Sequence, residues 1–207
     1  MGTREIGKEI ATETQRHQGL EQIRAFVAVR VSAEVERSIE ELIAELRSHN
    51  DGIKWVSSAN LHLTLKFLGP SVPVEKIDRL KLELEKIAAA TSPFELEASG
   101  VGGFPNLKHP HVLWVSLRGE ALGDLAARVD DVASRGGFER EQRTFRPHLT
   151  IARLKRPMLQ SDTRARIEAV RARAFGVSTI REMTLYRSTT APTGPIYQAL
   201  RPFKFSA

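Results

Sequence analysis

The spacing of apolar side chains predicts alternating strands and helices along the first half of the chain. Residues 25–31 are apolar except for Arg30 and are rich in β-branched side chains, which is typical of a buried strand. Ser32 is a candidate helix cap, and apolar positions recur behind it at helical spacing, so we expect a helix over residues 33–48. Alternation predicts a second strand at residues 60–67, and an amphipathic pattern predicts a helix at 74–87.

The strand predicted at residues 60–67 has a polar face. Its leucines and Phe67 fall on one side, whereas His62, Thr64 and Lys66 fall on the other. We therefore expect a half-buried strand that presents these three polar side chains together.

The second half of the chain repeats this order of elements. A strand is expected at residues 111–117, a helix at 122–133 and another strand at 146–152. The remaining elements are a basic helix and two closing strands, over residues 161–173, 175–186 and 196–205.

The two halves also share a spacing. Phe26 precedes His62 by 36 residues and Leu113 precedes His148 by 35, and both histidines belong to a His-Leu-Thr sequence on a strand. Similarity at so long a period indicates an internal duplication with pseudo-twofold symmetry. We therefore predict an α+β fold of two similar lobes whose His-Leu-Thr strands face each other.

Composition narrows the class of protein. The 207 residues are 41% hydrophobic and 27% charged, which is typical of a soluble globular chain. The absence of cysteine excludes disulfides and thiol nucleophiles. Residues 1–22 are a polar N-terminal extension without the apolar segment of a signal peptide, and no stretch is long enough to span a membrane. We expect a cytoplasmic protein.

Charge is divided unevenly along the chain. Residues 1–100 hold 13 basic against 16 acidic side chains, whereas residues 101–207 hold 18 against 9. A basic half attracts polyanions such as RNA, because neutralising phosphates releases counterions. A solvated, arginine-rich surface explains the same numbers, so both interpretations stay open.

The two His-x-Thr sequences point to acid–base chemistry. On a strand, residues i and i+2 share a face, so His62 stands beside Thr64 and His148 beside Thr150. Around one cavity, one imidazole can accept a proton while the other donates one. The threonine hydroxyls can donate hydrogen bonds to oxygens that gain charge in a transition state. Such a set can cleave a phosphodiester without a metal.

These motifs, in the settings NLHLTLKFLG and RPHLTIAR, resemble those of the 2H phosphoesterase superfamily. The chain is most similar there to the bacterial and archaeal RNA 2',3'-cyclic phosphodiesterases, historically called 2'-5' RNA ligases. The resemblance runs from about Arg24 to Phe205. It implies lobes of antiparallel strands with outer helices around a central cleft, so we expect residues 23–207 to form a single bilobal domain. It also implies hydrolysis of a cyclic phosphate to a 2'-phosphomonoester, with neither metal nor cofactor. Nothing is implied for residues 1–22.

Several neighbours of the motifs are candidates for binding substrate. Arg153 could neutralise phosphate, but strict alternation puts it opposite His148 unless the strand twists or bulges, so a structural or RNA-backbone role is equally open. Lys66 could approach phosphate or be an ordinary exposed lysine. Phe26 and Tyr197 could stack on a base or belong to the core.

A basic cluster flanks the second motif and could follow an RNA backbone or simply be solvated. Its members are Arg140, Arg143, Arg146, Lys155 and Arg156. A metal site is not expected, because His109-Pro110-His111 has no nearby carboxylates to complete three or four ligands.

The leading functional hypothesis is hydrolysis of RNA ends that carry a 2',3'-cyclic phosphate, as part of RNA processing. Alternatives are 2'-5' joining of RNA ends and a non-catalytic RNA- or nucleotide-binding module of the same fold. We expect a monomer acting on RNA or on a small cyclic nucleotide. The resemblance suggests that His62 is the acid and His148 the base, whereas sequence symmetry gives no preference.

Overall fold

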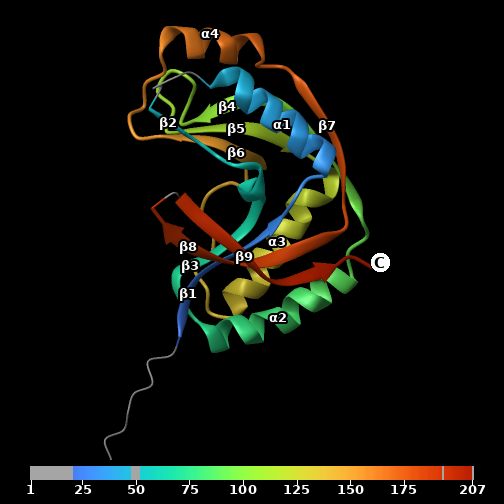
Figure 1. The fold of residues 1–207 in the computed structure, drawn as a ribbon. Coiled ribbons are helices and arrows are strands. Elements are labelled where there is room, and N and C mark those ends of the chain that lie inside the picture. The colour runs from blue at the N-terminus through green and yellow to red at the C-terminus, as the bar shows by residue number, and fades with distance from the viewer. Residues whose placement is uncertain (1–20, 48–51, 193, 207) are drawn as a thin grey trace, which may run out of the picture.

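The computed structural model describes residues 21–47, 52–192 and 194–206, which form two antiparallel sheets (Figure 1). The first sheet has the strand order β3, β1, β8, β9, with bounds Leu63–Pro73, Gln22–Val29, Glu182–Ala191 and Gly194–Lys204. The second has the order β2, β6, β5, β4, β7, with bounds Ile53–Trp55, His148–Leu154, Val112–Arg118, Phe94–Phe104 and Ala174–Ile180. The two His-Leu-Thr motifs therefore belong to different sheets, where β3 is an edge strand and β6 lies between β2 and β5.

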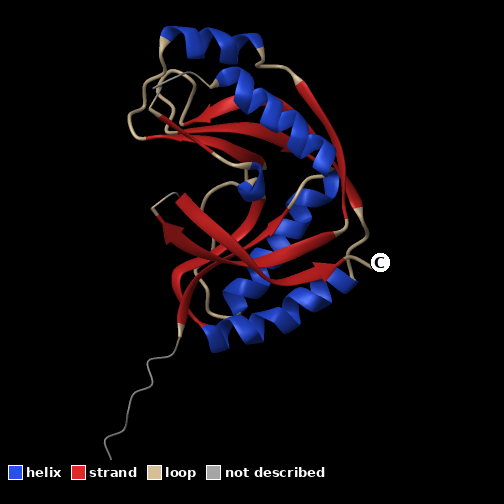
Figure 2. Cartoon of the chain, viewed as in Figure 1, coloured by secondary structure: helices blue, strands red, loops and turns tan. Residues whose placement is uncertain are grey.

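Four α-helices and one 3-10 helix accompany the sheets in the described residues. They are α1 (Ala33–Leu46), η1 (Ser58–Asn60), α2 (Val74–Ala89), α3 (Glu120–Arg135) and α4 (Ser161–Ala169). Figure 2 shows the α-helices on the outer sides of the sheets. None of these helices is long and apolar enough to cross a membrane.

Helices α1 and α3 each pack against a strand of the other sheet, which is not the sheet of the strand that precedes them. Helix α1 follows β1 of the first sheet but packs against β7 of the second, and α3 follows β5 of the second sheet but packs against β3 of the first. Each helix has an apolar stripe that must be buried against a sheet. In α1 this stripe includes the buried residues Val35, Ile39 and Leu42. Each lobe is thus built from both halves of the chain.

The predicted α+β fold of two similar lobes is confirmed, with corrections to its elements. The strand predicted at 60–67 begins only at Leu63 and continues to Pro73, and residues 58–60 form η1 instead. The helix predicted over 161–173 ends at Ala169, and the closing strand predicted over 175–186 is two strands, because the chain passes from the second sheet to the first at Arg181. Strands β2 and β4 were not predicted. The predicted extension at 1–22 lies outside the described residues except for its last two, and Gln22 already begins β1.

The glycines of β4 explain why its pattern is hard to recognise. Glycine normally weakens a strand, but a side chain at Gly102 would collide with the indole of Trp114, which packs over it from β5. At Gly100, φ is +77° and the pairing with β5 shifts by one residue, which is a β-bulge that suits glycine. Close packing and backbone shape, which leave no periodic signal, determine this strand.

Candidate active site

Strand β3 contains a β-bulge directly after its motif. Two consecutive residues of β1 pair with Thr64 and Lys66, which leaves Leu65 without a residue opposite. The alternation therefore breaks, so Lys66 turns into the core with 4% of its surface exposed, and Phe67 is 41% exposed. The prediction that Lys66 shares the polar face of His62 and Thr64 is wrong for this reason.

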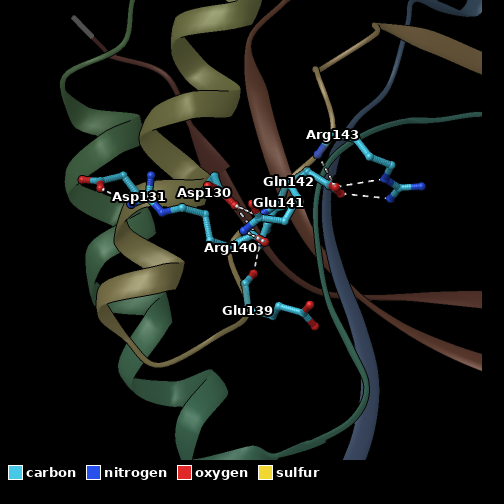
Figure 3. A network of polar contacts seen from close by, with 8 residues as sticks. Asp130, Asp131, Glu139, Arg140, Glu141, Gln142 and Arg143 are labelled. Atoms are coloured by element: carbon cyan, nitrogen blue, oxygen red, sulfur yellow. Dashed lines mark hydrogen bonds and ion pairs between the residues drawn. The ribbon is translucent and has the colours of Figure 1, made fainter.

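Lys66 instead joins β3 to helix α3. Its Nζ donates to Asp130 Oδ1 at 2.5 Å and to the backbone carbonyl of Glu139. Asp130 also accepts from the backbone N–H of Glu141 at 3.1 Å. Figure 3 shows Asp130 within the network formed with residues 139–143. The lysine thus anchors the segment that leads toward the second motif.

Strand β6 contains a bulge at the same place. Two consecutive residues of β5 pair with Thr150 and Ala152, and Ile151 has no residue opposite. Arg153 consequently returns to the side of His148 and Thr150 and lines the same cavity as they do. Strict alternation is wrong here too, and the bulge is the exception that the sequence analysis left open.

The two motif strands contact each other where the sheets meet, and a cleft of about 570 Å³ lies between them. Residues of both sheets line it. The predicted site residues it brings together are Phe26, His62, Thr64, His148, Thr150, Arg153 and Tyr197. Those that do not line it are Lys66, Arg140, Arg143, Arg146, Lys155 and Arg156.

Both imidazoles are held in the same way. His62 Nδ1 lies 2.7 Å from the carbonyl oxygen of Asn60, and His148 Nδ1 lies 2.6 Å from that of Arg146. A carbonyl can only accept, so Nδ1 carries the hydrogen in each ring and Nε2 is left free for proton transfer. In both motifs the anchoring carbonyl belongs to the residue two positions earlier.

The pKa values of both histidines are lowered below their usual value. Burial is the main cause for His62, with the positive charges of Arg30, Arg153 and His148 adding to it. Burial also lowers the pKa of His148, and Arg153 adds to it. In each case the anchoring carbonyl opposes the shift. Neutral imidazoles are therefore favoured at pH 7, and an anion bound between them would favour the protonated form.

Aromatic rings pack against each imidazole. Phe26 and Tyr197 lie with their centroids 4.8 and 5.0 Å from that of His62. Phe104 lies 5.0 Å from His148, edge to face. Phe26 is only 5% exposed and also stacks on Tyr186, so most of its surface belongs to the core.

Three cations line the cleft, and no carboxylate does among the described residues. Arg24 comes from β1 and stacks over Phe67, 4.4 Å from its ring centroid. Lys54 comes from β2 and pairs in register with Arg153 of β6. The cleft is therefore suited to an anion.

Several lining residues were not predicted from the sequence, among them Arg24, Lys54, Trp55, Asn60, Phe67 and Ser188. Arg24 had a usable signal, because it stands two positions before Phe26 on β1 and so shares its side. Lys54 lies on a strand of three residues, too short for any periodicity.

Two of the five members of the basic cluster near the second motif, Arg140 and Arg143, form ion pairs. Arg140 bonds Asp131 at 2.9 Å, and Arg143 bonds Glu141 through two nitrogens, as Figure 3 shows. The bond to Arg143 lowers the pKa of Glu141 to about 2. A role for the five basic residues along RNA stays a prediction. Within the described residues, no three His, Asp or Glu side chains gather as metal ligands.

Comparison with known proteins agrees with this geometry. A family model of the 2'-5' RNA ligase superfamily matches residues 35–191. A protein of Archaeoglobus fulgidus named RNA 2',3'-cyclic phosphodiesterase is 35% identical over 183 residues, covering 88% of this chain and 100% of the relative. A Methanocaldococcus jannaschii protein of the same name is 31% identical and covers 86% and 99%.

Solved structures share the fold. The TT0787 protein of Thermus thermophilus has a TM-score of 0.75 at 29% identity, covering 88% of this chain and 98% of its own. Escherichia coli LigT, crystallised with 3'-AMP, has a TM-score of 0.71 at 27% identity and covers 90% and 100%. The similarity extends across nearly all of the described residues.

Proposed function

This chain belongs to the 2'-5' RNA ligase superfamily, and we propose that it hydrolyses 2',3'-cyclic phosphate ends of RNA to 2'-phosphomonoesters. The observation that carries the proposal is the convergence of two identically anchored histidines, each beside a threonine, in one cationic cleft. The curated relatives named RNA 2',3'-cyclic phosphodiesterase support the same activity. The LigT structure with 3'-AMP supports a nucleotide as the group bound.

In the proposed reaction, water attacks phosphorus opposite the departing 3' oxygen. His148 takes a proton from the water through Nε2, the P–O3' bond breaks, and His62 gives a proton to the 3' oxygen. The product has a 2'-phosphate and a 3'-hydroxyl, and each histidine ends in the protonation state in which the other began. Proton transfer by such groups typically contributes about 10²–10⁴-fold each.

The remaining groups bind the phosphate. We assign the hydroxyls of Thr64 and Thr150 to the two non-bridging oxygens, where they donate hydrogen bonds that strengthen as charge develops. Arg153 neutralises the phosphate from the second sheet, and Arg24 and Lys54 add positive charge. No step is assigned to a metal or cofactor.

The phosphate also resolves a conflict in the site. The acid must be protonated, yet burial lowers the pKa of both imidazoles. A bound phosphodiester anion brings a negative charge between them and favours the imidazolium form of His62 when substrate is present. Substrate binding thus favours the protonated form of the acid.

The test is turnover of an RNA oligonucleotide that ends in a 2',3'-cyclic phosphate, with the product compared with 2'- and 3'-phosphate standards. We expect addition of one water and a 2'-phosphate. A 3'-phosphate would reverse the orientation of the substrate. An RNA with a free 5'-hydroxyl in the same reaction measures joining, and faster joining than hydrolysis would make that the main activity. Binding without turnover would identify a non-catalytic module.

A further inference from the structure

A second cavity, of about 200 Å³, lies beside the cleft. Its lining includes Arg30, Arg181, Glu182, Thr184 and Tyr186. The ring of Tyr186 stacks on that of Phe26, with centroids 5.2 Å apart, and Phe26 lines the cleft. This pair of rings stands between the two cavities.

One face of the first sheet runs through both cavities. Strands β1 and β8 pair without irregularity, so Phe26 lies opposite Tyr186 and Ala28 opposite Thr184 on the same face. Ser188, which lines the cleft, lies on that face too, four residues from Thr184. That separation is about 13 Å along the strand. A polymer with one end in the cleft could follow β8 into the second cavity.

Two groups in this cavity have binding capacity that the described residues do not use. Thr184 is only 6% exposed, and among these residues its hydroxyl has no hydrogen-bond partner. Arg181 lies where the chain crosses between the sheets, and no described carboxylate pairs with its guanidinium. Arg30, by contrast, is held by Glu36 at 2.6 Å. An unpaired cation and a hydroxyl that lines the same cavity suit an anionic oxygen.

We propose that the second cavity binds a phosphodiester of the RNA strand whose cyclic phosphate end occupies the cleft. Arg181 pairs with the phosphate, and Thr184 donates a hydrogen bond to one of its oxygens. The inference rests on the proposed function, since it takes the cleft as the site of the reacting end. It makes RNA oligonucleotides better substrates than cyclic mononucleotides, which cannot reach both cavities.

The carboxylate of Glu182 also lines the cavity and weakens this binding by repulsion. The proposal therefore requires opposite effects from neighbouring residues. Removing the charge of Arg181 should weaken oligonucleotide binding, whereas removing that of Glu182 should strengthen it.

The experiment compares a cyclic mononucleotide with a six-nucleotide RNA that ends in a cyclic phosphate. For Arg181→Gln we expect KM for the RNA to rise about tenfold, and for Thr184→Val about threefold. Glu182→Gln should lower it. None of these variants should change kcat or mononucleotide kinetics. Arg181→Gln should also reduce the slope of log KM against log salt by about 0.7, the value for one single-strand phosphate contact.

Matched controls are available on the surface. Arg118→Gln removes the same charge from an exposed position that lines neither cavity, and Thr189→Val makes the same exchange on the exposed part of β8. Both should behave as wild type. Thermal unfolding of each variant shows whether it is folded.

Unchanged RNA kinetics in Arg181→Gln would overturn the proposal, as would equal losses with both substrates, which would locate the defect in the cleft. Inorganic phosphate competing with neither substrate, together with unchanged RNA affinity, would overturn it as well. If wild type turns over neither substrate, the proposed function fails by itself. The second cavity is then tested by fluorescence anisotropy of a labelled RNA with a 2'-phosphate end, whose affinity Arg181→Gln should still lower.

Discussion

Strands β3 and β6 have the same geometry but different chemistry. Each places His-Leu-Thr before a bulge and then returns one side chain to the cleft. That side chain is Phe67 in β3 and Arg153 in β6. The residue before it is the buried Lys66 in β3 and the small Ala152 in β6. The backbone duplicates the acid–base site, and the positions after the bulge make the two sides of the cleft unequal.

The two histidine anchors differ in their support as well. The Asn60 carbonyl belongs to the last residue of η1, whose Ala59 and Ser58 carbonyls accept from Arg30 at 2.7 and 3.2 Å. The Arg146 carbonyl precedes Pro147, whose own carbonyl accepts from the backbone of β5 at 3.2 Å. The Arg30 side chain holds the segment that carries the Asn60 carbonyl, whereas a backbone bond to the second sheet holds the segment that carries the Arg146 carbonyl. The first anchor is therefore easier to alter by mutation.

The largest effect should come from the histidines themselves. We expect His62→Ala and His148→Ala each to lower turnover of a 2',3'-cyclic phosphate by about 10²–10⁴-fold. A substrate with sulfur in place of the 3' oxygen needs no proton from the acid. It should therefore restore the turnover of His62→Ala and not that of His148→Ala. The reverse pattern would exchange their roles. More than a tenth of wild-type activity in either variant would contradict the mechanism.

Lys66→Ala should lower the free energy of unfolding, because β3 depends on this buried lysine whereas β6 has Ala152 at the equivalent place. It leaves Asp130, which is 16% exposed, without its cation, and removing one partner of a mostly buried pair costs about 3 kcal/mol. The measurement is the free energy of unfolding in urea. Lys86→Ala removes an exposed lysine that pairs with Glu83 on α2 and should change the free energy of unfolding by less than about 1 kcal/mol. Equal losses would show that Lys66 is an ordinary surface lysine.

The residues after the two bulges should respond differently to truncation. Arg153→Ala removes a charged partner of the phosphate and should lower kcat/KM by about tenfold. Phe67→Ala removes a partly exposed ring and should lower it less, mainly through KM. Initial rates at several substrate concentrations test this. Similar losses in kcat would mean that Phe67 and Arg153 contribute equally to the reaction.

The smallest effect should be a change in pH dependence. The base must be neutral and the acid protonated, so activity falls below the pKa of the base and above that of the acid. Because both pKa values are lowered from 6.5, kcat/KM should reach its maximum below pH 6.5. Arg30 lowers the pKa of His62 and is not a cause of the shift in His148.

Arg30→Gln removes this charge and should therefore raise only the limb that belongs to His62, whereas Arg30→Lys keeps the charge but loses the paired bonds to η1 and should leave that limb in place. With His62 as the acid, the alkaline limb moves to higher pH and the acidic limb stays. Movement of the acidic limb alone would make His62 the base. Movement of both limbs would mean that the variant disturbs the whole cleft.

The sequence predicts the motifs well because period-2 alternation places His and Thr on one face without further information. It mispredicts Lys66 because a bulge depends on pairing with β1, which is remote in sequence. Lys54 reaches the site from a strand of three residues that has no pattern of its own. Thr184 looks like an interior strand residue, and only the register with β1 places it beside a cavity. Local periodicity thus predicts side chains up to the first irregularity of the sheet.

Because α1 and α3 each pack against the other unit's sheet, the two lobes depend on each other for their hydrophobic cores. A single strand–helix–strand unit cannot cover its own sheet, because its helix lies on the sheet of the other unit. One copy alone would expose an apolar helix face and an uncovered sheet, whereas two copies that trade helices complete both cores. Neither strand–helix–strand unit is therefore expected to form a stable lobe alone, and separating the two halves of the chain should unfold both cores.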